Sequence, residues 1–345
     1  MTGPGRRRVG SMPLVWGVAV LGGALLLGVA VGPADLPVGA VFVELIDKIP
    51  LVSLDSGLDE RQAAIVWELR FPRALLGALV GATLAAAGGA YQGVFRNPLA
   101  DPYLLGVAAG AGLGATLAIA AGGSNSVVVP VAAFAGGFAA VAATYMLGGV
   151  AGVRRTGVTL ILAGVAVASF FTAAQTFVQQ QNADTIREVF SWILGRLGTV
   201  GWREVAIMAP YAAVSLAVIL AHRRLLDVLA VGEEEAATLG VSPSRIRLAV
   251  VLAATLGTAA AVAVSGLIGF VGIVVPHTVR LVFGSSYRVI LPLSVLGGAA
   301  FLVVADTVAR TVLSPAEVPI GVVTAFVGGP FFAVVLRTAA RGGAR

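Results

Sequence analysis

The sequence contains no cysteine, two histidines and a single lysine among its 345 residues. Without cysteine the chain cannot form a disulfide, a thiolate nucleophile, an iron–sulfur cluster or a cysteine-ligated zinc site. The two histidines, His222 and His277, are too few for a histidine metal site. The lone lysine, Lys48, is flanked by Asp47 and Ile49 and does not follow a glycine-rich phosphate loop, so the chain cannot hydrolyse ATP by that route. We therefore expect no catalytic residue, no metal and no cofactor in this chain.

Charge is scarce as well. Only 12% of the residues are charged, whereas soluble domains carry about 25%. Hydrophobic residues make up 58% of the chain, which leaves too little polar surface to cover a globule in water. The composition therefore indicates a multi-pass membrane protein. Since a spanning helix takes roughly 20 residues, the chain has room for at most about a dozen spans.

Eight stretches of the sequence lack aspartate, glutamate, lysine and arginine. They are 9–34, 74–95, 102–153, 156–183, 205–222, 248–279, 289–305 and 318–336. The stretch 102–153 is too long for one helix and contains the turn composition Gly-Gly-Ser-Asn-Ser at 122–126, which predicts two spans. The stretch 248–279 forms either one long helix or two short helices joined near Ser265 and Gly266. Nine or ten spans result.

Basic residues mark the side of a membrane on which loops remain. Arginines at 6–8 precede the first span, and arginines at 337, 341 and 345 follow the last one. Both termini are therefore predicted to be cytoplasmic, and the number of spans to be even. The net charge of +6 is a signal of topology and does not indicate a nucleic-acid partner.

We predict an all-α polytopic membrane protein with ten transmembrane helices, a single domain over 1–345 and a cytoplasmic tail over 1–13. The first span could instead be a secretory signal peptide. Its apolar stretch 14–31 is longer than that of a usual signal peptide and has no clear cleavage site, which favours a retained helix.

The spans contain almost no acidic residue that could bind a coupling ion. Secondary transporters bury an acid near the bilayer midplane to bind a proton or a sodium ion. Asp306 is the exception, and it lies four residues before Arg310, where an i,i+4 ion pair is expected. An ion-coupled secondary transporter is therefore the weaker hypothesis, and we expect the chain to take its energy from another subunit.

The segment after the sixth span has the pattern of short capped helices. Glu233, Glu234 and Glu235 would lie in the first turn of one helix, where the helix dipole favours acids, and Leu239-Gly240 would end it. Ser242-Pro243 suits the N-cap and first position of a second short helix. The residues alone leave open whether this segment is a rigid docking surface or a solvated connector.

Two periodic patterns concern helix faces. Small residues recur at every fourth position, at 77, 81, 85, 89 and 93 and again at 106, 110 and 114, which is typical of closely packed membrane helices. Uncharged polar residues form one stripe at i, i+3, i+4 and i+7 on the span 156–183. They are Thr172, Gln175, Thr176 and Gln179. Such a stripe faces either neighbouring helices or a water-filled pathway, because lipid would leave its hydrogen bonds unmade.

Several motifs, in colinear order from about Arg70 to Arg337, resemble the FecCD-type permeases, which are membrane subunits of type II ABC importers for iron siderophores, haem and vitamin B12. The motifs are LRFPR at 69–73, QGVFRNPLADPYLLG at 92–106, LAGV at 162–165, Gly232-Glu233 with Leu239-Gly240, GLIGFVGIVVPH at 266–277 and PIGVVT at 319–324.

The resemblance implies a type II ABC importer permease fold with ten helices per chain. It implies a dimer of two copies or of paired paralogues, two cytoplasmic ATPase subunits that bind ATP and magnesium, and an extracytoplasmic substrate-binding protein. The chain would then be a non-hydrolytic subunit in the cytoplasmic membrane. The expected substrate is an iron–siderophore complex, with vitamin B12 and haem as alternatives. The alternatives stay open because the binding protein, and not the permease, usually selects the substrate.

The resemblance also assigns roles to particular segments. Gly232 to Gly240, in a cytoplasmic loop over 225–245, correspond to the coupling helices that the ATPase grips. Arg70, Arg73 and Arg310 correspond to arginines that meet glutamates of the binding protein, although their positions alone also suit interfacial anchors.

The polar stripe is placed by the same resemblance beside the translocation pathway. Thr156, Gly157 and Val158 correspond to the inner gate of the family. They depart from the Thr-Ser pair of the vitamin B12 permease, so the chemistry of this gate is not carried over.

Overall fold

The computed structural model describes residues 11–48, 54–123, 127–150, 157–197 and 201–342. Within these ranges the regular elements are all helices, which confirms the all-α prediction. The longer helices are α1 (Ser11–Ala30), α4 (Phe71–Val94), α6 (Val128–Val150), α7 (Gly157–Gln181), α9 (Arg203–Ala221), α12 (Pro243–Ser265), α14 (Tyr287–Thr311) and α15 (Ile320–Gly342). The shorter elements are α2 (Val38–Asp47), α3 (Glu60–Ala64), the π-helical turn η1 (Ile65–Arg70), α5 (Val107–Ala120), the 3-10 turn η2 (Ala183–Thr185), α8 (Ile186–Ile193), α10 (Arg223–Val231), α11 (Glu233–Thr238) and α13 (Val271–Phe283).

Seven helices of the described part are long and apolar enough to cross a membrane, and three shorter apolar helices accompany them, at Val107–Ala120, Val271–Phe283 and Ile320–Val335. The ambiguous stretch 248–279 contains two helices, because α12 ends at Ser265 and α13 begins at Val271. The break near Ser265 and Gly266 is therefore confirmed. The total of ten spans stays a prediction.

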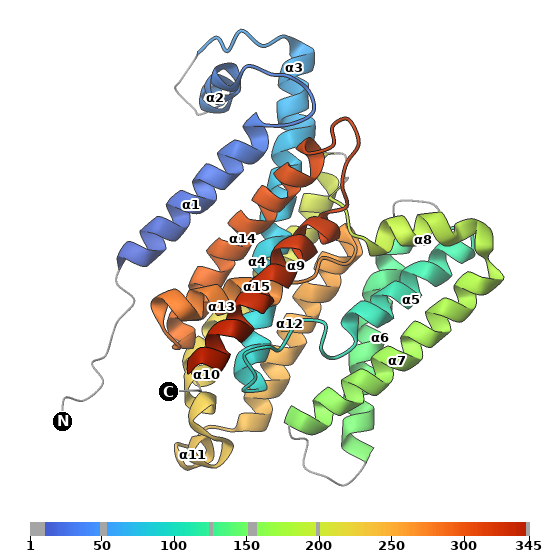
Figure 1. Cartoon of the computed structure of the whole chain (residues 1–345), viewed down its shortest axis with the longest axis vertical. Helices are drawn as coiled ribbons and strands as arrows, with labels where there is room; N and C mark the ends of the chain where they lie inside the picture. Colours follow the sequence, from blue (N-terminus) through green and yellow to red (C-terminus); the bar gives the residue numbers. More distant parts are fainter. Residues whose placement is uncertain (1–10, 49–53, 124–126, 151–156, 198–200, 343–345) are drawn as a thin grey trace.

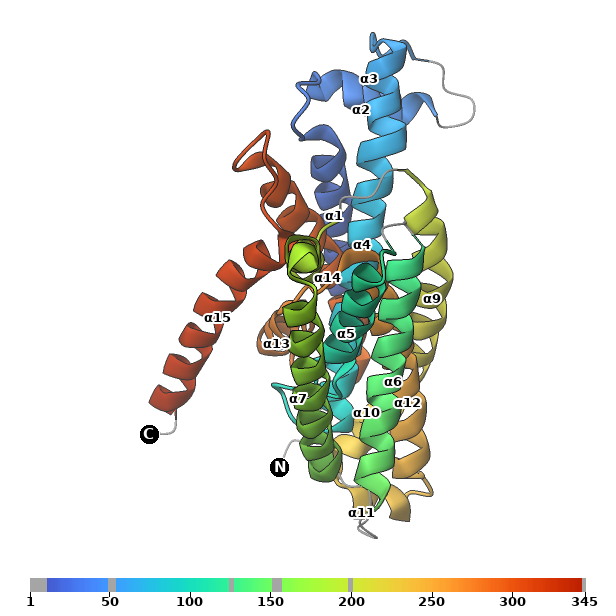
Figure 2. The ribbon, with the colours of Figure 1, turned by 90° about the vertical axis from the view of Figure 1, so that its right-hand side faces the viewer.

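The helices form a bundle with a centre and two flanks (Figure 1). In this view α4, α9 and α12 run through the middle, α1, α13 and α14 lie on one side, and α5 to α8 lie on the other. We call the end of the bundle that carries α10 and α11 the α11 end, and the opposite end, with α2 and α3, the α2 end. Helix α1 begins and α15 finishes toward the α11 end. Figure 2 shows that α15 projects away from the rest of the bundle.

Helix α4 is the most enclosed of the long helices, and it contacts α1, α9, α12, α13 and α14. Its small residues make this possible. A Cβ atom built at Gly81 would lie 2.2 Å from the carbonyl oxygen of Gly298 in α14, and one at Gly88 would lie 1.9 Å from that of Gly272 in α13. Backbones approach this closely only where no side chain intervenes, which confirms the prediction that the small-residue pattern serves helix packing.

The same device joins α5 to α6. A Cβ atom at Gly110 would lie 2.2 Å from the carbonyl oxygen of Gly136, and one at Gly114 would lie 2.1 Å from that of Ala132. Helix α7 packs on both α5 and α6, so the three helices form a unit, and this unit reaches the centre mainly through α12.

We predict that Gly88→Ala destabilises the protein, because the new methyl group would force α4 and α13 apart. Overpacking of this kind costs roughly 1–3 kcal/mol. The melting temperature in detergent or nanodiscs should fall by several degrees. Gly22→Ala is the matched control, since a Cβ atom at Gly22 in α1 would meet nothing within 4 Å. Equal melting temperatures for the two variants would contradict the close α4–α13 contact.

Candidate functional site

The two consecutive short helices α10 and α11 lie at the α11 end of the bundle (Figure 1). Helix α11 carries Glu233, Glu234 and Glu235 in its first turn, at the positive end of the helix dipole. Gly240 follows the helix with a φ of +76°, a left-handed conformation that glycine adopts without steric cost. The predicted short helix with an acidic start and a glycine stop is confirmed.

The prediction that Pro243 begins a second short helix is wrong. Pro243 is the first residue of α12, because the uncharged residues after Arg247 continue the helix as far as Ser265. The second short helix of this segment is α10, which precedes α11. Ser242 does occupy the N-cap position of α12, but its hydroxyl lies 3.3 Å from the hydroxyl of Ser244 and does not bond to a helix N–H.

Helix α11 is attached on one side and open on the other. Its Ala236 is fully buried, and Glu233 forms an ion pair with Arg247 of α12. In contrast the residues on either side of α11 are open: Val231, the last residue of α10, is 69% exposed, and Leu239, just after α11, is 68% exposed. The segment thus presents two large apolar side chains and several carboxylates outward, and its role as a docking surface for the ATPase stays a prediction.

Five charged residues meet at the α2 end and form what we call the arginine cluster. They are Arg70, Arg73, Asp306, Arg310 and Glu317. Arg73 donates to Asp306 at 2.8 to 3.1 Å and to Glu317 at 2.8 and 3.0 Å. Arg310 Nε lies 3.3 Å from Asp306 Oδ2, which confirms the i,i+4 ion pair. The Asp306 carboxylate is therefore shared by two guanidinium groups.

Arg70 and Arg310 of the arginine cluster also hold the end of α1. Arg70 donates to the carbonyl oxygens of Val29 and Ala30 at 3.1 and 2.8 Å, and Arg310 donates to that of Gly28. The last carbonyls of a helix have no partner within the helix and carry its negative dipole end. The two arginines therefore cap α1 and bind it to η1, which leads directly into α4, and to α14.

This geometry bears on the predicted docking role of the three arginines. Arg70 and Arg310 are 4% and 3% exposed, and both are engaged inside the chain. The outer members are Arg73 and Glu317, whose side chains are 14% and 42% exposed. The hydrogen bonds from Arg73 hold the pKa of Glu317 below its usual range, so the stability from this pair is present at neutral pH and is lost as the pH falls through that pKa. The docking role stays a prediction, and Arg73 is its best-placed arginine.

The polar stripe on α7 is divided between two surroundings. Gln175 is buried, and its Oε1 would lie 2.8 Å from a Cβ atom at Gly112, so it packs against α5. Thr172 and Thr176 are exposed, and the hydroxyl of Thr176 donates to the carbonyl oxygen of Thr172 at 2.9 Å. Gln179 is half-buried. Of the two alternatives, helix packing describes Gln175, and a pathway lining remains a prediction for the two threonines.

The segment that resembles the inner gate lies where α7 begins. Thr156 lies outside the described residues. Gly157 is the first residue of α7, and a Cβ atom there would lie 3.4 Å from the ring of Phe95, just after α4. Val158 is 68% exposed. The start of α7 is thus packed against the end of α4, while its gating role stays a prediction.

Two cavities open near α8. The larger one, of about 1030 Å³, has charged residues from η2, α8 and the start of α9 around an apolar floor that includes Phe134 and Ile207. The smaller one, of about 520 Å³, is almost wholly apolar and lies between Leu194, Phe270 and Phe326 of α15. Neither gathers a set of metal ligands, since no group of three or more His, Asp or Glu residues converges in the described part of the chain.

The sequence patterns did not single out Asp227 and Arg280, which the structure places in a polar network at the α11 end. Asp227 is the only acid of α10, and Arg280 lies in the last turn of α13. Ser286, just before α14, is a residue type that often caps helices, and it was the one sequence signal that pointed to the start of this helix. Nothing in the sequence spacing connects it with Asp227, 59 positions earlier.

Comparisons with known proteins agree on one family. The model of the FecCD transport family matches residues 20–338. A cobalamin import system permease of Halobacterium salinarum is 39% identical, over 96% of this chain and 98% of its own. A hemin transport system permease of Yersinia pestis is 38% identical, over 79% of this chain and 81% of its own. The solved structure of an ABC transporter assigned to the metal-chelate type, in an inward-facing conformation, matches with a TM-score of 0.83 and 28% identity, over 95% of this chain and 100% of the other.

We predict that Asp306→Asn destabilises the protein strongly, because it leaves Arg73 and Arg310 buried without their shared charge. Breaking a buried ion pair by removing one partner costs about 3–5 kcal/mol. The melting temperature should fall well below that of Glu317→Gln, where the lost pair is partly exposed and contributes about 0–1 kcal/mol. If Asp306→Asn has the same melting temperature as the wild type, the arginine cluster does not hold α1, α4 and α14 together.

Proposed function

The chain belongs to the FecCD transport family, whose members work with ATPase and substrate-binding partners, and we infer that it is an integral membrane permease of an ABC importer. We propose that it translocates an iron–siderophore complex or a related large metal chelate and that ATP hydrolysis on a separate subunit drives the transport. The chain itself hydrolyses nothing. The relatives named for cobalamin and hemin make vitamin B12 and haem the alternative substrates.

One observation carries the coupling part of this proposal. The α10–α11 segment is attached to the bundle by the buried Ala236 and by the ion pair of Glu233, yet it leaves Val231 and Leu239 exposed beside a row of glutamates. We propose that the cytoplasmic ATPase docks on this surface, with Gly232 to Gly240 as the contact. With this orientation the α11 end, together with the start of α1 and the end of α15, would lie on the cytoplasmic side of the cytoplasmic membrane, which fits the prediction that both termini are cytoplasmic.

The pathway part of the proposal is supported by α7 and α15. Each exposes large apolar side chains that the described residues leave uncovered, among them Phe170 and Phe177 in α7 and Phe326 in α15. A second copy of the chain would cover part of these faces, and the exposed threonines of α7 would line the space between the copies. Weak hydroxyl and amide contacts suit a chelate that must pass without being held. The gate would lie at the start of α7, at Thr156, Gly157 and Val158.

The binding protein would dock at the α2 end, beside the arginine cluster. Arg73 and Glu317 form the outer rim there, so they would meet the partner first. Arg70 and Arg310 would contribute through the positive potential of the cluster and through the position of α1. An ion-coupled carrier is the competing function class, and it would need a midplane acid, whereas Asp306 is already shared by Arg73 and Arg310.

We predict that Leu239→Ala lowers the amount of ATPase subunit retained when the complex is purified, by about tenfold or more, because the contact loses a buried leucine. Leu313→Ala is the matched control, since Leu313 is 61% exposed and follows α14 at the α2 end. Equal retention of the ATPase by the two variants would contradict docking at α11. If the wild type retains no ATPase at all, the ABC importer proposal itself fails.

We predict that single cysteines at Thr172 and Thr176 react with water-soluble thiol reagents, because the natural chain has no cysteine and thiolate formation requires water. A cysteine at Gln175 should react much more slowly, since that side chain packs against α5. The rates at the threonines should change when the ATPase is trapped with ATP. If cysteines at the two threonines react as slowly as the cysteine at Gln175 in every nucleotide state, the stripe does not line a water-filled pathway.

A further inference from the structure

Asp227 connects the α10–α11 segment to α14 by directional bonds. Its Oδ1 accepts the backbone N–H of Tyr287 at 2.6 Å, and its Oδ2 accepts the hydroxyl of Ser286 at 2.8 Å. Arg288 adds an ion pair at 3.3 Å. Ser286 occupies the N-cap position of α14 but does not cap it with its own side chain. The N-terminus of a 25-residue helix is therefore capped by a carboxylate from another helix, where the helix dipole favours a negative charge.

The network continues from α14 into α13 and α4. Arg280 of α13 donates to the hydroxyl of Tyr287 at 3.3 Å and to Oε1 of Gln92 in α4 at 3.1 Å. Gln92 in turn donates to the carbonyl oxygen of Gly272, near the start of α13, at 3.3 Å. Asp227 is thus linked to α14, and through Tyr287, Arg280 and Gln92 the polar contacts continue to α13 and α4.

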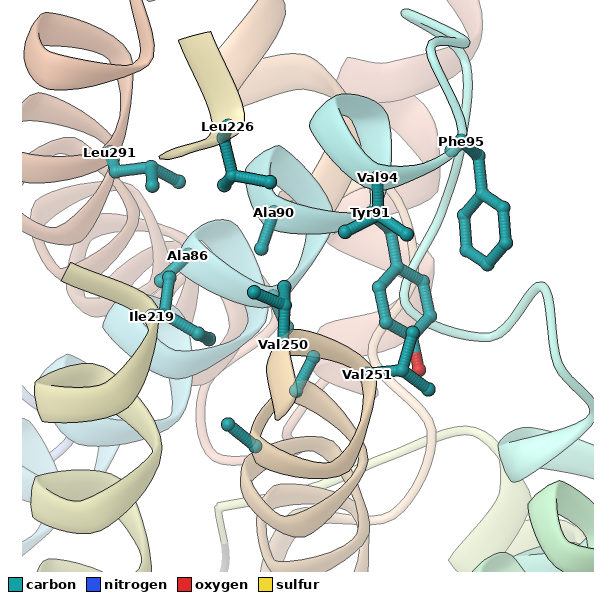
Figure 3. Close-up of a cluster of buried hydrophobic side chains, with 14 of the residues drawn as sticks. Ala86, Ala90, Tyr91, Val94, Phe95, Ile219, Leu226, Val250, Val251 and Leu291 are labelled. Atoms are coloured by element: carbon teal, nitrogen blue, oxygen red, sulfur yellow. The ribbon is translucent and has the colours of Figure 1, made fainter. Parts of the chain in front are cut away.

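Apolar packing supports the same junction but gives it no fixed direction. Leu226, the neighbour of Asp227 on α10, lies beside Leu291 of α14 and Ala90 of α4 (Figure 3). A Cβ atom at Gly93 would meet Leu226 at 3.2 Å and the Tyr287 ring at 3.1 Å. Dispersion contacts of this kind resist separation of the helices, whereas hydrogen bonds to a carboxylate also fix their angle and register.

The two short helices are tied to different long helices. Helix α11 is fixed to α12 by the pair of Glu233 and Arg247, whereas α10 is fixed to α14 by Asp227. Helix α14 runs from this junction to Arg310 in the arginine cluster and then leads into α15, the helix that projects from the bundle (Figure 2). A displacement of α10 would therefore reach α14 and α15 through Asp227.

We propose that Asp227 is the positioning residue that transmits movement of the ATPase docking segment to α14 and α13. The inference rests on the proposed function, because it takes the α10–α11 segment as the surface that the ATPase moves. The residue touches neither substrate nor nucleotide. It acts by keeping α10 and the start of α14 as one body while the docking segment shifts.

The test uses the absence of natural cysteine in the complete complex in nanodiscs. The measured quantity is the stimulation of ATP hydrolysis by the binding protein, relative to hydrolysis without it. In Asp227→Cys under reducing conditions this stimulation should fall about tenfold, as expected when a charge-assisted hydrogen bond is lost, while the ATPase stays bound. In the double variant Asp227→Cys with Ser286→Cys, oxidation should restore the stimulation, because a disulfide then joins the two helices that the carboxylate joined.

Arg288→Gln is the matched control. It removes only the outer ion pair, whose arginine side chain is 57% exposed, and leaves both hydrogen bonds of Asp227 in place, so the stimulation should stay within about twofold of the wild type. If Asp227→Cys does not fold, Asp227→Asn replaces it. The amide keeps one acceptor oxygen, so an intermediate stimulation is expected.

Full stimulation in Asp227→Cys, or in Asp227→Asn where it replaces that variant, overturns the inference. So does an oxidised double variant that stays as poorly stimulated as its reduced form, because the link between α10 and α14 would then be present without the coupling. A wild type that binds no ATPase overturns the proposed function instead. The two failures are thus distinguishable in one set of preparations.

Discussion

Close contact between glycine backbones is the constraint on which the rest of this structure depends. In lipid there is no hydrophobic drive to bring apolar helices together, so association relies on close packing and on hydrogen bonds between helices. Helix α4 meets α14 at Gly81 and Gly298 and meets α13 at Gly88 and Gly272, with no side chain between the backbones. These contacts pack α13 and α14 directly against α4, the most enclosed helix of the bundle.

Polar groups fasten α1 and the α10–α11 segment to the bundle at its two ends. The arginine cluster binds the end of α1 to η1 and α14 at the α2 end, and Asp227 and Glu233 bind the α10–α11 segment to α14 and α12 at the α11 end. Between the ends, α7 and α15 keep large exposed apolar faces. A closely packed core, with hydrogen bonds and ion pairs at both ends of the bundle and exposed helices at its side, is the arrangement expected of a transporter that must move without unfolding.

The sequence predicted the helices better than the contacts of its charged residues. Uncharged runs located the apolar helices and the break at Gly266, because lipid allows so few charges in a span. The motifs identified the family, and the glutamates before Gly240 located α11. The side-chain contacts could not be predicted from the sequence. The burial of Arg70 depends on where α1 ends, and the burial of Gln175 depends on a glycine in α5. The hydrogen bonds of Asp227 depend on residues 59 and 60 positions later in the chain. The short helix α2 was also missed, because Glu44 interrupts its apolar pattern.

ATP-driven translocation by this chain is tested most directly by uptake into proteoliposomes that contain the permease, the ATPase and the binding protein. Labelled cobalamin, haemin and a ferric siderophore would be offered in turn, with ATP on the ATPase side and ionophores present to remove ion gradients and the membrane potential. The account predicts that one of these chelates accumulates only with hydrolysable ATP and that the ionophores have no effect. Uptake that proceeds without ATP and stops when the ion gradient is removed would contradict it.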